Sequence, residues 1–184
     1  MDIPELIKKA NQGSAAAQKA LYERFADKMM PVCRRYVKGP EDAEEVMLDG
    51  FFKFFHHLPA FHYQGEAALY AWLKRIVINE CLMFLRRKMA FTIVSETDAQ
   101  ELPLQEEALN NLSAAEIFTL IVQLPVGYRT VFNLHAIEGI PHREIAQLLG
   151  ITEGTSKSQL SKAKTLLQKG LMKNQTDYVR RKSK

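Results

Sequence analysis

The stretch that decides the fold runs from Ile140 to Gln168 and reads IPHREIAQLLGITEGTSKSQLSKAKTLLQ. Its apolar residues form two groups at helical spacing, and Gly150 separates the two groups. Glycine readily adopts the left-handed backbone conformation that ends a helix, and Thr152 can cap a helix that begins after it. The stretch therefore predicts a helix, a tight turn and a second helix.

The second of these helices has an apolar side and a polar side. The apolar side predicted from the spacing comprises Leu160, Ala163, Leu166 and Leu167. The remaining surface carries lysines and hydroxyl groups: Thr155, Lys157, Ser158, Ser161, Lys162 and Lys164. A helix-turn-helix places such a helix in the major groove of DNA, where these groups reach base edges and phosphates. We therefore expect duplex DNA as the partner, with an amphipathic helix of an ordinary bundle as the alternative.

Charge is distributed unevenly along the 184 residues, whose formal net charge is +4. Residues 89–128 contain no lysine or arginine and 6 acidic residues, whereas residues 129–184 contain 11 basic and 4 acidic residues, a net charge of +7. A basic segment attracts polyanions because phosphates release their counterions on binding. The pattern favours nucleic acid as the partner of the last third, although a solvated basic surface would show the same pattern.

Other classes of protein are disfavoured by what the sequence lacks. No apolar run approaches the roughly 18–20 residues of a membrane-spanning helix, and the first ten residues lack the apolar core of a signal peptide. The two cysteines, Cys33 and Cys81, and the five histidines form no set with metal-ligand spacing. No nucleophile with its base and no glycine-rich phosphate loop stands out. We expect a cytoplasmic protein without stable membrane insertion that is not an enzyme, with no catalytic residues, metal or cofactor.

The first half of the chain contains three further helical patterns. Apolar residues recur every three or four positions from Ala16 to Tyr36. A second helix follows the Gly39-Pro40 break, with acidic residues in its first turns, where they complement the helix dipole. Its aromatic residues are expected to pack in a core. A third helix is predicted from Ala67 to Lys88.

Residues 92–111 separate two helical blocks and show no sustained period, which predicts a linker. The second block opens with Ser113 and Glu116, whose spacing fits a capping box, and continues with helices that end near Pro125 and at Gly139. The predicted fold is all-α: two small helical domains joined by a flexible acidic linker, the C-terminal one containing the helix-turn-helix. The expected divisions are a domain at 1–90, a linker at 91–112, a domain at 113–172 and a basic tail at 173–184.

These patterns, in this order, resemble the extracytoplasmic-function (ECF) group of sigma-70 family RNA polymerase sigma factors. In the second block the resemblance rests on the motifs LPVGYRTVFNL (124–134), EG (138–139), EIA (144–146), LGI (149–151) and GTSKS (154–158). In the first block it rests on DAEE (42–45), the pair Phe51-Phe52 and AWLKRIVIN (71–79). The resemblance covers nearly the whole chain, and it implies a sigma factor that binds core RNA polymerase and directs promoter-specific transcription initiation.

The resemblance also assigns roles to individual residues. Polymerase binding would fall to Asp42, Glu44, Glu45, Asp49 and Phe52. Melting and holding the minus-10 element would fall to His62, Tyr63, Gln64, Trp72, Lys74, Arg75 and Asn79. Reading the minus-35 duplex would fall to Lys157, Ser158, Ser161 and Lys162, with Thr155 and Arg143 on phosphates, while Arg129 would brace the domain. The implied partners are core polymerase, through the coiled coil of its largest subunit and its flap, promoter DNA and an anti-sigma factor.

The chain departs from the family pattern at four positions. Leu48 stands where glutamine is usual, and Gly50 interrupts the acidic helix at a cost of about 1 kcal/mol relative to alanine. Ser156 replaces a usual apolar residue, and Gln159 replaces a usual arginine. The minus-35 sequence that relatives recognise therefore does not carry over to this chain. Two alternatives stay open: a stand-alone helix-turn-helix regulator, which leaves the first-block motifs without a purpose, and a sigma-like module that binds a regulator but not polymerase.

Overall fold

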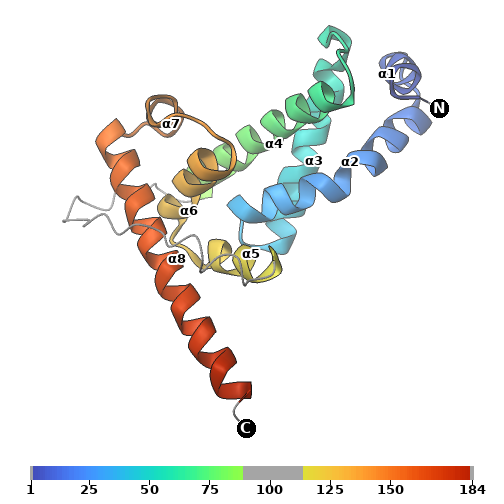
Figure 1. Ribbon diagram of the computed structural model, residues 1–184. Coiled ribbons are helices and arrows are strands. Elements are labelled where there is room, and N and C mark those ends of the chain that lie inside the picture. Colours follow the sequence, from blue (N-terminus) through green and yellow to red (C-terminus); the bar gives the residue numbers. More distant parts are fainter. Residues whose placement is uncertain (1, 89–113, 183–184) are drawn as a thin grey trace. The chain divides into compact units, whose positions relative to one another are not determined.

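The computed structural model describes residues 2–88 and 114–182, with side chains up to residue 172. The chain divides into two compact units, Met1–Ala90 and Phe91–Lys184. All regular secondary structure in the described residues is helical (Figure 1), which confirms the prediction of an all-α fold. None of the described helices is both long and apolar enough to cross a membrane. The predicted linker and the Ser113 cap lie outside the described residues.

Unit 1 is built around three long helices. Its elements are α1 (Ile3–Asn11), α2 (Ala15–Tyr36), α3 (Pro40–His57), the short 3-10 helix η1 (Leu58–Ala60) and α4 (Glu66–Lys88). Helices α2, α3 and α4 each pack on the other two, and α1 packs on α2 and η1 (Figure 1). The centre of the core contains fully buried side chains from all three long helices: Leu21, Phe25, Met29, Phe54, Leu69, Leu73 and Val77. The helices predicted at 16–36 and 67–88 are confirmed to within one residue.

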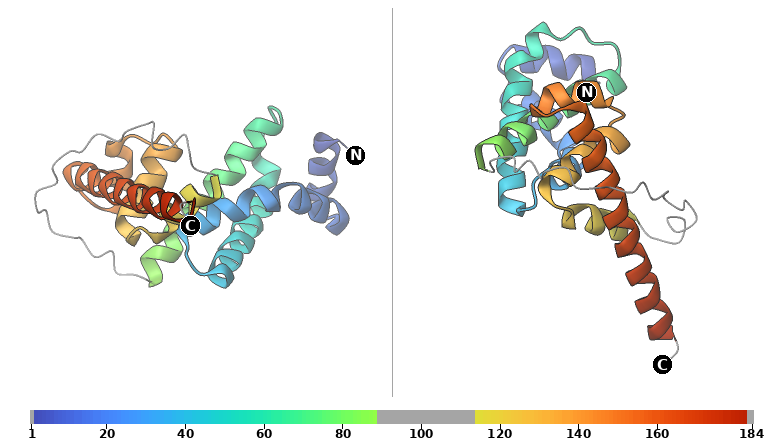
Figure 2. Two further views of the ribbon diagram at one scale, coloured as in Figure 1. Left: turned by 60° about the horizontal axis from the view of Figure 1, so that its bottom comes forward. Right: turned by 90° about the vertical axis from the view of Figure 1, so that its left-hand side faces the viewer.

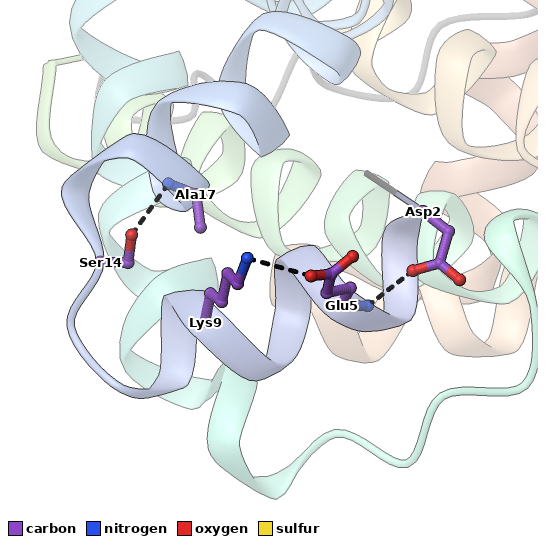
Figure 3. A network of polar contacts seen from close by, with 5 residues as sticks. All are labelled: Asp2, Glu5, Lys9, Ser14 and Ala17. Atoms are coloured by element: carbon purple, nitrogen blue, oxygen red, sulfur yellow. Dashed lines mark hydrogen bonds and ion pairs between the residues drawn. The ribbon is translucent and has the colours of Figure 1, made fainter.

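Side-chain caps fix the ends of the first two helices (Figure 3). The amide of Glu5 donates to the Asp2 carboxylate over 3.0 Å, and Glu5 forms an ion pair with Lys9 one turn later. Ser14 caps α2 in the same way, because its hydroxyl accepts from the amide of Ala17. The chain between Asn11 and Ala15 therefore changes direction in a defined turn, and α1 packs on α2.

Gly50 lies on the side of α3 that faces α4, where the two helices approach most closely. A β-carbon built at Gly50 would lie 2.8 Å from Cγ2 and 3.3 Å from Cα of Val77. The glycine is buried, so it does not interrupt the exposed face of α3 as its place in the sequence suggested. Its role is to let two backbones meet without a side chain between them.

Unit 2 is organised along a single long helix. Its elements are α5 (Ala114–Gln123), α6 (Val126–Phe132), the π-helical segment η3 (Asn133–Ile137), α7 (His142–Leu149) and α8 (Glu153–Lys182). Helices α5, α6 and α7 pack against α8, which extends beyond them as a rod (Figure 2). A small core of Ile121, Leu124, Ala163 and Leu167 joins α5 to α8. Helix α8 is thus much longer than expected and continues through most of the segment predicted as a basic tail.

The predicted helix-turn-helix is present as α7, a turn and α8. Gly150 ends α7 with a φ of 67°, and the Thr152 hydroxyl caps α8 by accepting from the amide of Thr155 over 3.0 Å. One predicted core position is wrong, because the Leu166 side chain is 39% exposed. The buried stripe instead runs through Leu160, Ala163, Leu167 and Leu171, which follows the 3.6-residue repeat and leaves Leu166 beside it.

Arg129 braces unit 2, as the resemblance implied. Its Nη1 donates to the carbonyl oxygens of Val122 and Leu124, each over 3.0 Å, and so satisfies the exposed carboxyl end of α5. Burial lowers the pKa of the Arg129 guanidinium from its ordinary value, but the group stays charged at any physiological pH.

Replacing Gly50 with alanine is expected to lower the free energy of unfolding by about 1–3 kcal/mol, because overpacking costs that much in a tight core. The gain of up to about 1 kcal/mol in helix propensity offsets the loss only in part. Urea unfolding followed by circular dichroism measures the change. Asp49→Ala, one residue away on the exposed side of α3, is the matched control and should change stability little. A Gly50→Ala protein as stable as the parent would show that α3 and α4 can move apart freely.

Candidate nucleic-acid and polymerase interfaces

A pocket of about 410 Å³ opens where η1 leads through residues 61–65 into α4. Its lining comprises His57, Ala60, Phe61, His62, Gln64, Ala68 and Trp72. The volume lies in the range of small-ligand pockets, roughly 300–1,000 Å³. Of the expected minus-10 residues, the structure brings His62, Gln64 and Trp72 together here. Tyr63 is exposed on the same loop and does not contribute to the lining.

Two aromatic rings form one wall of this pocket. The centroids of Phe61 and Trp72 are 4.5 Å apart and their planes differ by 18°, so the rings are stacked. Trp72 also contacts Phe54 of the core at 5.3 Å, which fixes its orientation. Both stacked rings are only partly buried, so they can accept a further planar group. The sequence patterns do not predict Phe61, because helical periodicity cannot locate a partner that lies outside the helix.

An ion pair with α2 holds the end of the pocket loop, residues 61–65, where it leads into α4. Gly65 turns the chain into α4 with a φ of 109°, a conformation that favours glycine. At the next residue, the Arg24 guanidinium donates from Nε to Oε1 of Glu66 over 3.0 Å and from Nη2 to Oε2 over 2.8 Å. The bond from Arg24 lowers the pKa of the Glu66 carboxyl, so the bidentate pair persists in mildly acidic solution.

The expected minus-10 residues on α4 divide between two sides of the helix. Arg75 and Asn79 are exposed and follow Trp72 at helical spacings of three and seven, so they continue the pocket side. Lys74 lies about 200° around the helix from Trp72, since each residue advances by about 100°. Its Nζ is 6.0 Å from the ring centre of Tyr70, which the Lys28 Nζ approaches to 5.9 Å. The structure therefore does not bring Lys74 together with the pocket.

The exposed side of α3 combines acidic and apolar groups. Glu44, Glu45 and Asp49 are exposed, in agreement with the predicted acidic surface. Phe52 is 74% exposed and Leu48, one turn before it, is 50% exposed. The expectation that the aromatic residues of this helix pack in a core holds for Phe51 and Phe54 but is wrong for Phe52, which lies on the opposite side of α3. A monomer gains nothing from exposing two large apolar side chains side by side, so this pair indicates a protein contact surface.

Two other charged residues of this helix hold α3 on α4. Asp42 accepts from the Lys88 Nζ over 2.6 Å, so its carboxylate is engaged inside unit 1 rather than free for a partner. Lys53 lies 2.7 Å from Glu80, whose side chain is only 5% exposed. A buried carboxylate needs such a partner, because an unpaired buried charge is costly. Asp42 was expected to contact polymerase; in the free chain its carboxylate forms this exposed contact with Lys88, and its role toward polymerase stays a prediction.

Only some of the expected minus-35 residues are exposed on the first turns of α8. Lys157 is exposed, and Ser158, Ser161 and Lys162 are partly exposed. Thr155 is only 8% exposed, and its Oγ1 lies 2.9 Å from that of Thr152. The expectation that Thr155 lies on the outer surface is therefore wrong, because the capping turn directs its side chain inward.

Two further residues complete this surface. Arg143, at the start of α7, is exposed as expected. Lys157 forms an ion pair with Glu153 over 2.8 Å, one turn earlier on α8, and this pairing lowers the pKa of the Glu153 carboxyl. The outer surface at the start of α8 therefore has an acidic group among its basic ones. The part of the chain that the structure describes contains no cluster of three or more potential metal ligands.

Comparison with known proteins finds the same two-part organisation. The family model for Sigma-70 region 2 matches residues 21–91, and the model for Sigma-70, region 4 matches residues 114–167. The ECF RNA polymerase sigma-E factor of Haemophilus influenzae is 27% identical over 177 residues, covering 89% of this chain and 92% of that protein. The RNA polymerase sigma-H factor of Pseudomonas aeruginosa is 27% identical over 181 residues, covering 91% and 92%.

A solved structure shares the fold. The sigma factor RpoE of Bartonella quintana, solved in complex with the anti-sigma factor NepR, has a TM-score of 0.50 and 21% identity over 84% of this chain and 96% of that one. Region 2 and region 4 matches in the proper order, together with relatives that span nearly the full length, place this chain in the sigma-70 family of RNA polymerase sigma factors, within its ECF group. It is a promoter-directing factor, and the region 2 match sets aside the stand-alone regulator.

Replacing Trp72 with alanine is expected to reduce promoter melting roughly 5- to 100-fold, because stacking of one base on an aromatic ring contributes about 1–3 kcal/mol. Trp72→Phe keeps a ring beside Phe61 and should lose less. Permanganate footprinting of melted thymines with reconstituted polymerase measures the effect, and circular dichroism checks the fold. Lys74→Ala should change melting by less than about twofold, since its ammonium lies on another side of α4. Equal losses for Trp72→Ala and Lys74→Ala would contradict this assignment.

Proposed function

We propose that this chain brings core polymerase to promoters through three surfaces. The exposed side of α3 binds core polymerase, the pocket beside α4 holds bases of the melted minus-10 strand, and the first turns of α8 read the minus-35 duplex. The observation that carries the proposal is the stacked pair Phe61 and Trp72 in an open pocket, with Arg75 following on the same side of α4. This combination suits an unpaired base and the phosphate attached to it.

The pocket stabilises melted DNA by differential binding. A base leaves the duplex at a cost of a few kcal/mol, and contacts that exist only for the extruded base offset this cost. Phe61 and Trp72 supply the stacking surface, while the side chains of His62, Gln64 and Asn79 supply hydrogen-bonding groups for base edges. The chain performs no covalent chemistry in this scheme, since polymerase forms the RNA bonds. A cytoplasmic location follows from its partner.

The α3 surface fits a basic partner that also has an apolar contact point. Glu44, Glu45 and Asp49 attract basic groups, and Leu48 and Phe52 supply the apolar contact. The coiled coil of the largest polymerase subunit is the partner proposed for this surface, and the flap is the partner proposed for unit 2. Leu48, where the family usually has glutamine, enlarges the apolar contact. We extend the proposal to an anti-sigma factor that competes for the same exposed pair.

Run-off transcription on a pool of randomised promoters, with core polymerase in the presence and absence of this chain, tests the proposal directly. Selective initiation supports it and reveals the promoter sequence. A folded chain that neither binds core polymerase nor supports initiation would favour the sigma-like module that binds only a regulator.

Replacing Phe52 with serine is expected to weaken binding to core polymerase roughly 10- to 100-fold, because burying a phenylalanine contributes about 1.5–3 kcal/mol. Its side chain contributes little to the folded chain alone, so the melting temperature should stay the same. Surface-immobilised core polymerase measures the affinity. Leu48→Gln, which restores the residue usual in the family, should weaken binding less. Unchanged affinity in both variants would move the polymerase contact away from α3.

Replacing both Lys157 and Lys162 with alanine is expected to lower the slope of log affinity against log salt by about 2, since each lysine on a phosphate releases close to one counterion. Fluorescence anisotropy of polymerase-bound chain on the selected promoter measures the slope. Lys169→Ala, an exposed lysine further along α8, is the matched control and should keep the parent slope. An equal change in the control would indicate a diffuse charge effect rather than contact at the start of α8.

A further inference from the structure

Two histidines stack where the helix-turn-helix begins. His135 belongs to η3 and His142 is the first residue of α7, and their ring centroids are 4.1 Å apart with planes that differ by 16°. Gly139, with a φ of 73°, turns the chain between them. Two imidazoles this close disfavour a charge on both, because like charges repel. The pair is more stable when at least one ring is neutral.

Hydrogen bonds connect the pair to both helices of the motif. The Nδ1 of His135 donates to the carbonyl oxygen of Ile140 over 2.9 Å, since a carbonyl can only accept. The Nδ1 of His142 lies 2.8 Å from Oγ of Ser156, a fully buried residue in the first turns of α8. His142 therefore contacts η3 through its ring face and α8 through its Nδ1. Ser156 directly precedes Lys157, which belongs to the surface proposed to read DNA.

The charged groups around His142 favour its neutral form. Burial is the largest cause that lowers its pKa, followed by His135 on η3 and by Lys157 on α8, with a smaller effect of Lys164. Glu153 acts in the opposite direction, but it is paired with Lys157. Arg143, the next residue on α7, adds a further positive charge nearby. At neutral pH the ring of His142 is therefore uncharged.

We propose that His142 is a positioning residue for DNA reading: its neutral ring, stacked on His135 and bonded to Ser156, locks the start of α8 against the preceding turn, and protonation releases this lock. The inference rests on the proposed reading of duplex DNA by α8. Its consequence is that minus-35 binding weakens in mildly acidic solution, against the general tendency of DNA affinity to rise as a protein gains positive charge.

The direction of the effect follows from linkage. When the chain is unfolded or the lock is released, His142 takes up a proton near its ordinary pKa of 6.5. In the locked arrangement the pKa of His142 is lowered, so it takes up the proton only at lower pH. The released state then binds more protons below about pH 6.5, so falling pH favours it. The lock is complete above this pH and is lost progressively below it.

The experiment measures affinity of the full chain in complex with core polymerase for a labelled duplex carrying its selected promoter, from pH 7.5 to 5.5 at constant ionic strength. The parent affinity should fall severalfold across this range, because the released state takes up a proton that the locked state excludes. In His142→Asn, the amide can take the place of Nδ1, but the stacked ring is lost and the side chain cannot titrate, so affinity should be lower than that of the parent at pH 7.5 and should not fall further as the pH is lowered. His142→Phe keeps the stacked ring but not the bond, so it should bind more weakly than the parent at pH 7.5 and should show no fall of its own.

A matched control is available in unit 1. His56 and His57 form a second neighbouring pair, with ring centroids 5.0 Å apart, so His56→Asn replaces a histidine of a ring pair that lies outside the helix-turn-helix. It should keep the parent pH profile. A fall in His142→Asn as steep as that of the parent would overturn the proposal, as would loss of the fall in His56→Asn.

A second measurement separates this inference from the proposed function. Nuclear magnetic resonance of the free full chain follows the ring protons of His142 with pH. His135→Phe should move the titration midpoint of His142 up toward the ordinary value, since His135 is one of the groups that lower the pKa of His142. An unmoved midpoint would refute coupling within the pair whatever the DNA result. A moved midpoint, together with no specific duplex binding at any pH, would refute the proposed role of α8 and, with it, a role of His142 in DNA reading.

Discussion

The close contact between α3 and α4 determines the geometry of every surface proposed for unit 1. Gly50 allows the two helices to meet at Val77, and the contact is extended in both directions by the Asp42–Lys88 bond and the packing of Phe54 on Trp72. One side of this helix pair faces the core. The exposed side of α3 and the pocket side of α4 are then held at a fixed separation, so a partner on α3 has a defined position relative to DNA in the pocket.

Unit 2 depends less on apolar packing and more on internal polar contacts. Asn133, Ser156 and Gln159 are all buried, and the Gln159 amide occupies the space that Gly127 leaves open. This placement explains one departure from the family pattern. A residue that the family usually provides as arginine has turned inward here, so the reading surface relies on the lysines and serines that remain.

The sequence was sufficient to predict the elements whose signals are local. Helix spacing, Gly150 and the Thr152 cap predicted α2, α4 and the helix-turn-helix correctly. The sequence patterns did not predict features that depend on contacts between distant parts of the chain, or on the side of a helix on which a residue lies. Phe61 stacks on Trp72 from outside α4, Asp42 contacts Lys88 at the far end of another helix, and the role of Gly50 follows only from its contact with Val77. Thr155 and Leu166 were assigned to the wrong side of α8, because a one-residue step changes direction by about 100°.

The ion pair between Lys157 and Glu153 has a consequence for how the protein searches a genome. The Glu153 carboxylate lies 2.8 Å from the ammonium that is proposed to contact DNA, in the place that a phosphate would take, so a phosphate would first have to displace it. An exposed pair of this type is worth up to about 1 kcal/mol, or roughly fivefold in affinity. The displacement weakens contact with every site equally, while the base contacts of the proper sequence are unaffected. Because the cost is the same at every site, it shortens the time spent on DNA of any sequence and leaves the choice between a promoter and the roughly million or more competing sites of a genome to the base contacts.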